Sequence, residues 1–330
     1  AYECLQNIIT STKGLKTLTL GCLQDITELA DELLPLLGSY HSTTLSTLGL
    51  ASVKSDPNSY ALLHITPEHF ASFSAIQVLT VDYDYVNDEF LQVLTKPFKA
   101  PLRRLVLHIH GIDPSHRGTS ELAWHNFRNY NQQCSLVLNL LYSYEGVEQL
   151  NSGLLRQSMP LSTFRAFFCE WINIPSLRLL SEWYNETLEH LQLVDALDNR
   201  AWSIFSQHRG EEQNQPPDPL VMLAWRCKRL IYLSLIGYSY SATNLVAIAR
   251  LRGSALNELI IPEDFLEGDD PREPLTKEEI ENLSQDVSTS LDRSWAPVKL
   301  SSLHPSLQAV GNPDSDELIL SHILKDAQPF

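Results

Sequence analysis

The sequence predicts an α/β fold in which short parallel strands and helices alternate along a solenoid. The first observation is a leucine spacing, L-x-x-L-x-L, at residues 230–235 and again at 256–261. The second is the helical segment between them, which begins after Ser241, a good N-cap, and ends at Gly253, a good C-cap. One strand and one helix cannot bury an apolar face alone, so repetition every roughly 20 to 50 residues is typical of stacked units. We therefore expect a leucine-rich-repeat solenoid, a curved parallel sheet with helices on its convex side.

The same spacing recurs through most of the chain. In a strand, alternate residues share a face, so the two inner leucines of each unit point into one core. The interval between the leucine patterns that begin at residues 102 and 161 is about twice the usual length. The strand-like run CSLVLNLL lies within it and is interpreted as a degenerate repeat. We expect eight or nine units of about 26 to 31 residues, with strands at residues 15–20, 45–50, 76–81, 102–107, 134–141, 161–166, 188–193, 230–235 and 256–261.

Two segments interrupt or end this pattern. Residues 206–219 are polar and proline-rich without periodicity, which predicts a surface loop inserted in one repeat. Thr276 and Glu279 predict a capping box for a helix that runs towards Trp295 and covers the last repeat. We expect residues 1–296 to form the solenoid and residues 297–330 to form a weakly structured C-terminal tail, in which 316–324 could be a short helix or a docking peptide.

Composition excludes several classes of function. The net charge of −16 opposes nonspecific binding to nucleic acid, and no run approaches 18 uninterrupted apolar residues, so we expect neither a nucleic-acid nor a membrane partner. The five cysteines are far apart and form no C-x-x-C pair. We interpret them as buried reduced thiols of a cytoplasmic or nuclear protein.

No catalytic or cofactor-binding motif is recognisable, so we expect no enzyme and no cofactor. His108 and His110 share one face of a predicted strand, and His116 follows nearby. A metal needs three or four ligands at fixed geometry, and no second His or Cys pair is spaced to complete such a site. We therefore expect no metal and place these histidines on the solvent-facing side of the sheet.

A partner-binding face is predicted by the residues that flank the inner leucines. In the first two units these residues are small, whereas charged, imidazole and aromatic groups follow from the third unit onward. A solenoid does not need particular side chains there for stability, so polar groups can serve recognition; ordinary solvated surface is the alternative, and the helices or the 206–219 loop could bind instead. The candidate residues are Asp82, Arg104, His108, Arg165, His190, Gln192, Tyr232 and Ser234.

Two runs of the sequence are distinctive: PLVMLAWRCKRLIYLSLIGYSYSATNLVAIARLRGSAL and SLDRSWAPV. Both resemble F-box proteins with a leucine-rich-repeat substrate-binding region. Weaker similarity in PLRRLVLHIH, CSLVLNLL, PLSTFRAFF and LEHLQLVDALD extends the resemblance over most of residues 76–296. The resemblance implies a non-catalytic, substrate-recognition subunit of an SKP1-cullin-F-box E3 ubiquitin ligase. An F-box has no recognisable counterpart here and the chain begins at Ala1, so we expect a receptor portion whose SKP1 and cullin partners bind through an F-box outside it. The alternative is a leucine-rich-repeat scaffold or inhibitor outside any ubiquitin ligase.

Overall fold

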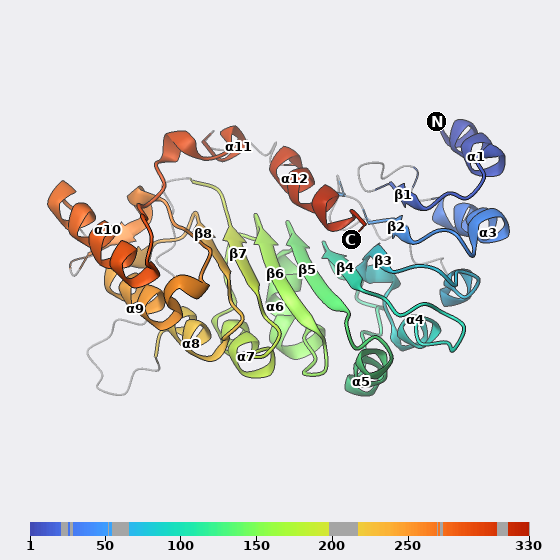
Figure 1. Cartoon of the computed structure of the whole chain (residues 1–330), viewed down its shortest axis with the longest axis horizontal. Coiled ribbons are helices and arrows are strands. Elements are labelled where there is room, and N and C mark those ends of the chain that lie inside the picture. The colour runs from blue at the N-terminus through green and yellow to red at the C-terminus, as the bar shows by residue number, and fades with distance from the viewer. Residues whose placement is uncertain are drawn as a thin grey trace. The chain divides into compact units, whose positions relative to one another are not determined.

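The fold is α/β, with nine parallel strands whose order in the sheet follows their order in the chain (Figure 1). This confirms the expected α/β class and the parallel direction of the strands. The computed structural model describes residues 1–20, 26, 29–51, 53–54, 66–197, 217–268, 270, 273–308 and 316–329; the predicted loop at 206–219 lies outside these up to residue 216. The chain divides into two compact units, residues 1–161 with 316–330 and residues 162–315.

Unit 1 contains five parallel strands whose inner leucines align across the sheet. Leu48, Leu79 and Leu105 pair in register and are fully buried, as the L-x-x-L-x-L spacing predicts. Burial of each such side chain contributes about 1.5–3 kcal/mol, so the row is a principal source of stability. The strands are β1 (Thr17–Thr19), β2 (Thr47–Gly49), β3 (Val78–Asp82), β4 (Arg104–Ile109) and β5 (Ser135–Leu141).

Helices of unit 1 pack on their neighbours in chain order, α1 against α3, α3 against η1, η1 against α4 and α4 against α5. Side-chain caps start two of them: Asn87 accepts from Phe90 N, and Ser120 accepts from Ala123 N. The unit contains α1 (Tyr2–Ser11), α3 (Ala30–His41), η1 (Pro67–Phe70), η2 (Tyr83–Tyr85), α4 (Asp88–Val93), α5 (Glu121–Tyr130), α6 (Tyr144–Gln149), the π-helical turn η3 (Leu150–Leu154) and α12 (Asp316–Asp326).

Unit 2 repeats the arrangement with four parallel strands. Leu191 pairs with Phe164 on one side and Leu233 on the other, and all three are buried. The strands are β6 (Leu161–Phe167), β7 (His190–Val194), β8 (Tyr232–Ile236) and β10 (Glu258–Ile260), and β9 (Tyr240–Ser241) pairs separately with β11 (Leu266–Glu267).

The helices of unit 2 also pack in chain order, α7 on α8, α8 on α9 and α9 on α10. The last of these begins with the predicted capping box of Thr276 and Glu279. Beyond it, Trp295 Nε1 donates to Leu259 O at 2.8 Å, which ties the segment after the helix to β10. The helices are α7 (Ile174–Trp183), α8 (Pro219–Arg226), α9 (Ala242–Arg252), α10 (Lys277–Leu291) and α11 (Pro305–Gln308), with short turns η4 (Gly253–Ala255), η5 (Glu263–Phe265) and η6 (Leu300–Ser302).

The residue directly after a strand adopts a left-handed backbone at three strands, β5, β6 and β8. Tyr142 follows β5 with φ +51°, Phe168 follows β6 with φ +55°, and Gly237 follows β8 with φ +83°. At Gly237 a Cβ would lie 2.6 Å from the carbonyl oxygen of Asp195, whose amide donates to Ile236 O. Glycine is therefore required there by close backbone approach as well as by conformation.

No helix among the described residues is both long and apolar enough to cross a membrane.

Candidate partner-binding face

In unit 2 the predicted residues form two neighbouring rows. Arg165, Gln192 and Ser234 pair in register across β6, β7 and β8, and His190 pairs with Tyr232 one row away. The rings of His190 and Tyr232 are stacked, with centroids 5.5 Å apart and an angle of 27° between their planes. The sequence pattern therefore placed all five side chains on one face.

Burial divides these five side chains. Ser234 and Gln192 are buried, whereas Arg165, His190 and Tyr232 are half-buried and keep exposed surface. Burial raises the pKa of Tyr232 above its ordinary value, so its hydroxyl stays protonated near neutral pH. The accessible part thus offers a cation, an imidazole and a phenol, groups suited to directed hydrogen bonds with a protein ligand.

In unit 1 the predicted residues lie at opposite ends of β4. Asp82 pairs directly with His108 near the carboxyl ends of β3 and β4, while Arg104 begins β4. Asp82 and His108 are each only 1% exposed, and His110 is 2% exposed. The expectation that the histidines face solvent is therefore wrong.

The C-terminal helix accounts for part of this burial. Helix α12, red in Figure 1, lies beside the carboxyl ends of β4 and β5, and Ile323 and Ala327 border the same hollow as His108. Arg104 Nη1 donates to the carbonyl oxygens of Asp326 at 3.0 Å and Gln328 at 3.2 Å. This part of the predicted face is covered by the chain itself.

A buried polar cluster lies next to this covered face. Lys54 Nζ contacts Asp84 Oδ2 at 2.5 Å, and both side chains are at least 95% buried. The backbone amide of Lys54 donates to His110 Nε2 at 3.3 Å, and His110 Nδ1 lies 3.8 Å from Asp82 Oδ1. Burial, with Lys54 and His108 nearby, lowers the pKa of His110 well below 6.5, so its ring is neutral and carries its proton on Nδ1. The cluster ties Lys54 to Asp84 and His110, and its His110–Asp82 contact is not an ion pair.

Two features of the described residues bear on metal and thiol chemistry. They contain no group of three or more His, Cys, Asp or Glu side chains arranged to hold a metal. Burial raises the pKa of Cys134 and Cys227 to about 12, so these thiols are not nucleophiles near neutral pH. Cys169 is also buried, but Cys4 is exposed, which corrects the expectation that every cysteine is buried; Cys22 lies outside the described residues.

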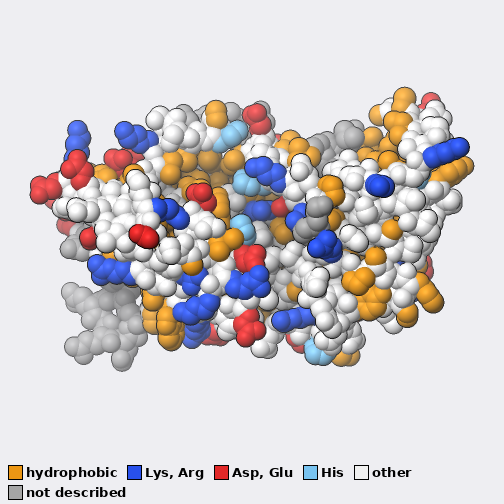
Figure 2. All heavy atoms as spheres, viewed as in Figure 1, with side chains coloured by type: hydrophobic (Ala, Val, Ile, Leu, Met, Phe, Trp, Pro, Cys, Tyr) orange, Lys and Arg blue, Asp and Glu red, His pale blue; other side chains and the backbone are white. Residues whose placement is uncertain are grey.

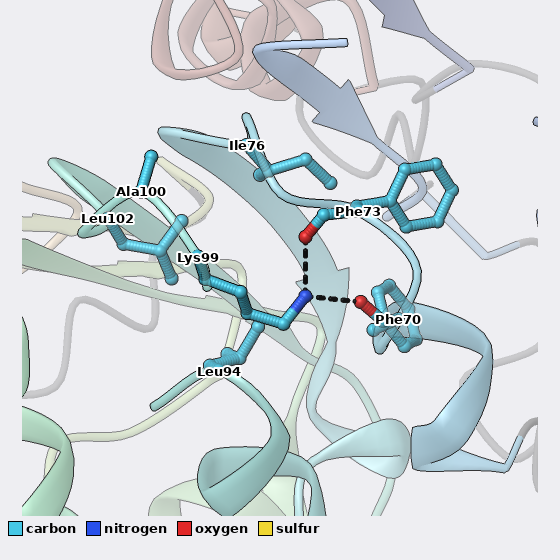
Figure 3. A pocket seen from close by; sticks show the side chains of 7 residues that line it. All are labelled: Phe70, Phe73, Ile76, Leu94, Lys99, Ala100 and Leu102. Carbon is cyan, nitrogen blue, oxygen red and sulfur yellow. Dashed lines mark hydrogen bonds between the residues drawn. The ribbon is translucent and has the colours of Figure 1, made fainter. Parts of the chain in front are cut away.

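Lys99 lies in a small apolar pocket (Figure 3). The pocket is lined by Phe70, Phe73, Ile76, Leu94, Ala100 and Leu102. Burial, with Lys96 nearby, lowers the pKa of Lys99 to about 8. Its Nζ donates to Phe70 O at 2.6 Å and to Phe73 O at 2.5 Å, as the dashed lines show. Because the amine is held by the carbonyls of Phe70, the last residue of η1, and of Phe73, its role is to fix the turn that follows η1.

Two polar residues of the covered face were missed from the sequence. Asn139 Nδ2 donates to Asp326 Oδ2 at 3.3 Å, and Tyr142 OH donates to Asp316 Oδ1 at 3.0 Å. Asn139 flanks the inner leucines of the degenerate repeat and pairs in register with His108, so the pattern used for the other units would have identified it. Tyr142 follows the strand and carries no comparable signal.

On the molecular face shown in Figure 2, Lys and Arg side chains are interspersed with Asp and Glu. Exposed apolar groups also occur on the helices, and Trp225 of α8 is 51% exposed, with the guanidinium carbon of Arg226 6.0 Å from its ring centroid. This side of α8 is a second surface with the aromatic and arginine groups that are enriched at protein interfaces.

Comparison with known proteins identifies distant relatives. No protein-family model matches the chain. It is 28% identical to "F-box only protein 33" of Homo sapiens over 304 residues, and 28% identical to the Mus musculus protein of that name over 307 residues. Each match covers 90% of this chain but 52% and 51% of the relatives, so the chain spans about half the length of the curated relatives it matches.

Proposed function

From its distant relationship to F-box only protein 33, we propose that this chain is the substrate-recognition part of an SKP1-cullin-F-box ubiquitin ligase. The chain binds a protein substrate and performs no chemistry itself. SKP1 and cullin bind through an F-box outside it, and the complex acts in the cytoplasm or nucleus. Similarity over 90% of the chain is the single observation that carries this proposal.

We also propose that the strand–helix units form a leucine-rich-repeat solenoid. Support comes from strands that follow chain order and from the buried leucines that pair in register within each unit. In such a fold, the strand positions that face away from the helices are free to vary without loss of core packing. The substrate then contacts this face, most directly the half-buried Arg165, His190 and Tyr232 of unit 2.

The second candidate is a leucine-rich-repeat scaffold or inhibitor that works outside any ubiquitin ligase. It uses the same face, because the polar rows of unit 2 support protein binding whatever complex the chain joins. Binding through α8 is the alternative location, favoured by exposed Trp225 and its contact with Arg226.

The location of the substrate site is tested by comparing two variants in cells. Proteins labelled in proximity to the wild-type chain are compared with those labelled by an Arg165→Ala, Tyr232→Ala chain and by a Trp225→Ala chain. Loss of a shared set of proteins only with the first variant supports the face, because both replaced side chains keep exposed surface on it. Loss of the labelled proteins only with Trp225→Ala would show that the substrate binds at α8 instead. Near-UV circular dichroism of each purified variant establishes that the fold is intact.

A further inference from the structure

In unit 1 the C-terminal segment packs on the side of the sheet that carries Thr80 and His108, and we call this surface the groove. A small hollow remains between the two, bordered by Thr19, Gly49, Ala51, Thr80 and His108 of the sheet side and by Ile323, Leu324 and Ala327 of the C-terminal segment. Thr19, Gly49, Ala51 and Thr80 are small residues, so they leave room for the C-terminal segment to approach this side of the sheet.

Helix α12 occupies this groove with a stripe of aliphatic side chains. Ile319, Ile323 and Ala327 are spaced four residues apart, which places them on one side of a helix, and none is more than 4% exposed. Leu324 borders the groove but is 45% exposed. The helix thus packs through one apolar face and leaves its other side exposed, as an amphipathic helix does.

Polar donors of the sheet contact both ends of α12. At its carboxyl end, Arg104 binds the carbonyl oxygens of Asp326 and Gln328, and Asn139 binds the Asp326 carboxylate. A cation is favourable there because the last carbonyls of a helix carry partial negative charge. In the first turn, Tyr142 OH donates to the carboxylate of Asp316. The donors therefore fix the direction and the register of the helix in the groove.

We propose that this groove is a binding site for an amphipathic helix of a partner protein, and that α12 fills it in cis until such a helix displaces it. The proposal goes beyond the proposed function, because it adds a site for a protein partner in unit 1, separate from the unit 2 residues Arg165, His190 and Tyr232. The recognised helix has an acid in its first turn, two aliphatic residues four apart, a small residue four further on, and an acid directly before that small residue, as in Asp316, Ile319, Ile323, Asp326 and Ala327.

The physical basis is exchange between equivalent ligands. The tail competes intramolecularly, and a tethered ligand acts at an effective concentration of about 1 mM. A free helix with the same contacts must overcome that concentration, so it binds the intact chain weakly and binds a chain with a disabled tail much more tightly. The sheet residues that contact the helix are the same in both chains.

The test uses the full chain and a fluorescent peptide of residues 316–329 as the probe. In a chain with Ile319→Asp and Ile323→Asp, buried carboxylates remove α12 from the groove, because burying a charge in apolar surroundings is strongly unfavourable. Fluorescence anisotropy should show that the peptide binds this chain at least about tenfold more tightly than the wild-type chain. A peptide with the same two replacements is the matched control and should not bind.

A second variant locates the binding. Arg104→Gln, added to the double-aspartate chain, removes the cation at the end of the helix and should weaken peptide binding about tenfold. Equal peptide binding by the wild-type and double-aspartate chains, with circular dichroism showing both folded, would overturn the proposal, as would undiminished binding after Arg104→Gln. The peptide assay contains no ligase component, so it is independent of SKP1. If the peptide binds but SKP1 does not associate with the protein in cells, the ligase role is refuted and the groove proposal stands.

Discussion

Replacement of Gly237 by alanine tests the close packing of two successive strand ends. The left-handed backbone, φ +83°, costs a residue with a side chain about 1–2 kcal/mol. The new Cβ would also lie 2.6 Å from Asp195 O and 2.8 Å from Asp195 C, which are backbone atoms that cannot rotate away. Relief of that clash lowers the free energy of unfolding by about 1–3 kcal/mol. Alanine also reduces the conformational entropy of the unfolded chain, which offsets about 0.4–1 kcal/mol of this loss. We expect Gly237→Ala to destabilise unit 2 by about 3 kcal/mol.

Gly118 provides the matched control. Its φ is +67°, but nothing lies within 4 Å of an added Cβ, so Gly118→Ala should cost only about 1 kcal/mol. Asparagine, which tolerates the left-handed conformation, should nearly restore stability at residue 118 but not at 237.

Urea unfolding measures both pairs, and hydrogen exchange at the Asp195 amide gives a local readout, because that amide donates to Ile236 O. Gly237→Ala should speed this exchange by about 100-fold. Equal destabilisation by the two alanine variants, or rescue of residue 237 by asparagine, would refute the close approach.

Three further predictions follow from buried groups. Lys54→Met and Asp84→Asn should each lower the free energy of unfolding by about 3–5 kcal/mol, because each change leaves a buried partner unpaired. In a double-mutant cycle measured by urea unfolding, the double variant should lose less than the sum of the two single losses. Additive losses would show that the pair does not interact. Burial holds the folded-state pKa of His110 well below 6.5, so the unfolded chain binds more protons just below pH 6.5. Stability should therefore fall as the pH drops below 6.5, and less steeply in His110→Phe, whereas identical pH profiles would contradict the neutral ring. Iodoacetamide at pH 8 should modify exposed Cys4 in the folded protein, but Cys134, with a pKa of about 12, only after unfolding; rapid native labelling of Cys134 would contradict its burial.

Local sequence patterns were sufficient to predict the repeating elements. The alternation of apolar residues placed Leu79 and Leu105 in one buried row, and the same alternation placed Arg165 and Gln192 side by side on the opposite face. Capping chemistry predicted the start of α10, since Thr276 and Glu279 satisfy the first backbone amides of that helix reciprocally. These features depend on residues close in sequence or on a simple period.

The covered face could not be predicted in the same way. Periodicity identifies which side of the sheet Asp82 and His108 occupy, but it does not show whether another segment lies over them. The contacts of α12 join residues 174 to 224 positions apart, and neither Arg104 nor Asn139 carries a local mark of its distant partner. Burial of His108 therefore depends in part on tertiary packing of the tail, which its strand pattern does not reveal.

The proposed recognition role within a ubiquitin ligase is tested most directly by affinity purification of the protein as cells express it, followed by quantification of SKP1 and cullin. Both should co-purify with the expressed protein, and residues 1–330 alone should bind neither directly. The Arg165→Ala, Tyr232→Ala variant of the expressed protein should retain SKP1 and lose its substrate. Absence of SKP1 and cullin from the purified protein would contradict the ligase assignment, and tight direct binding of SKP1 to residues 1–330 would show that the adaptor site lies within this chain.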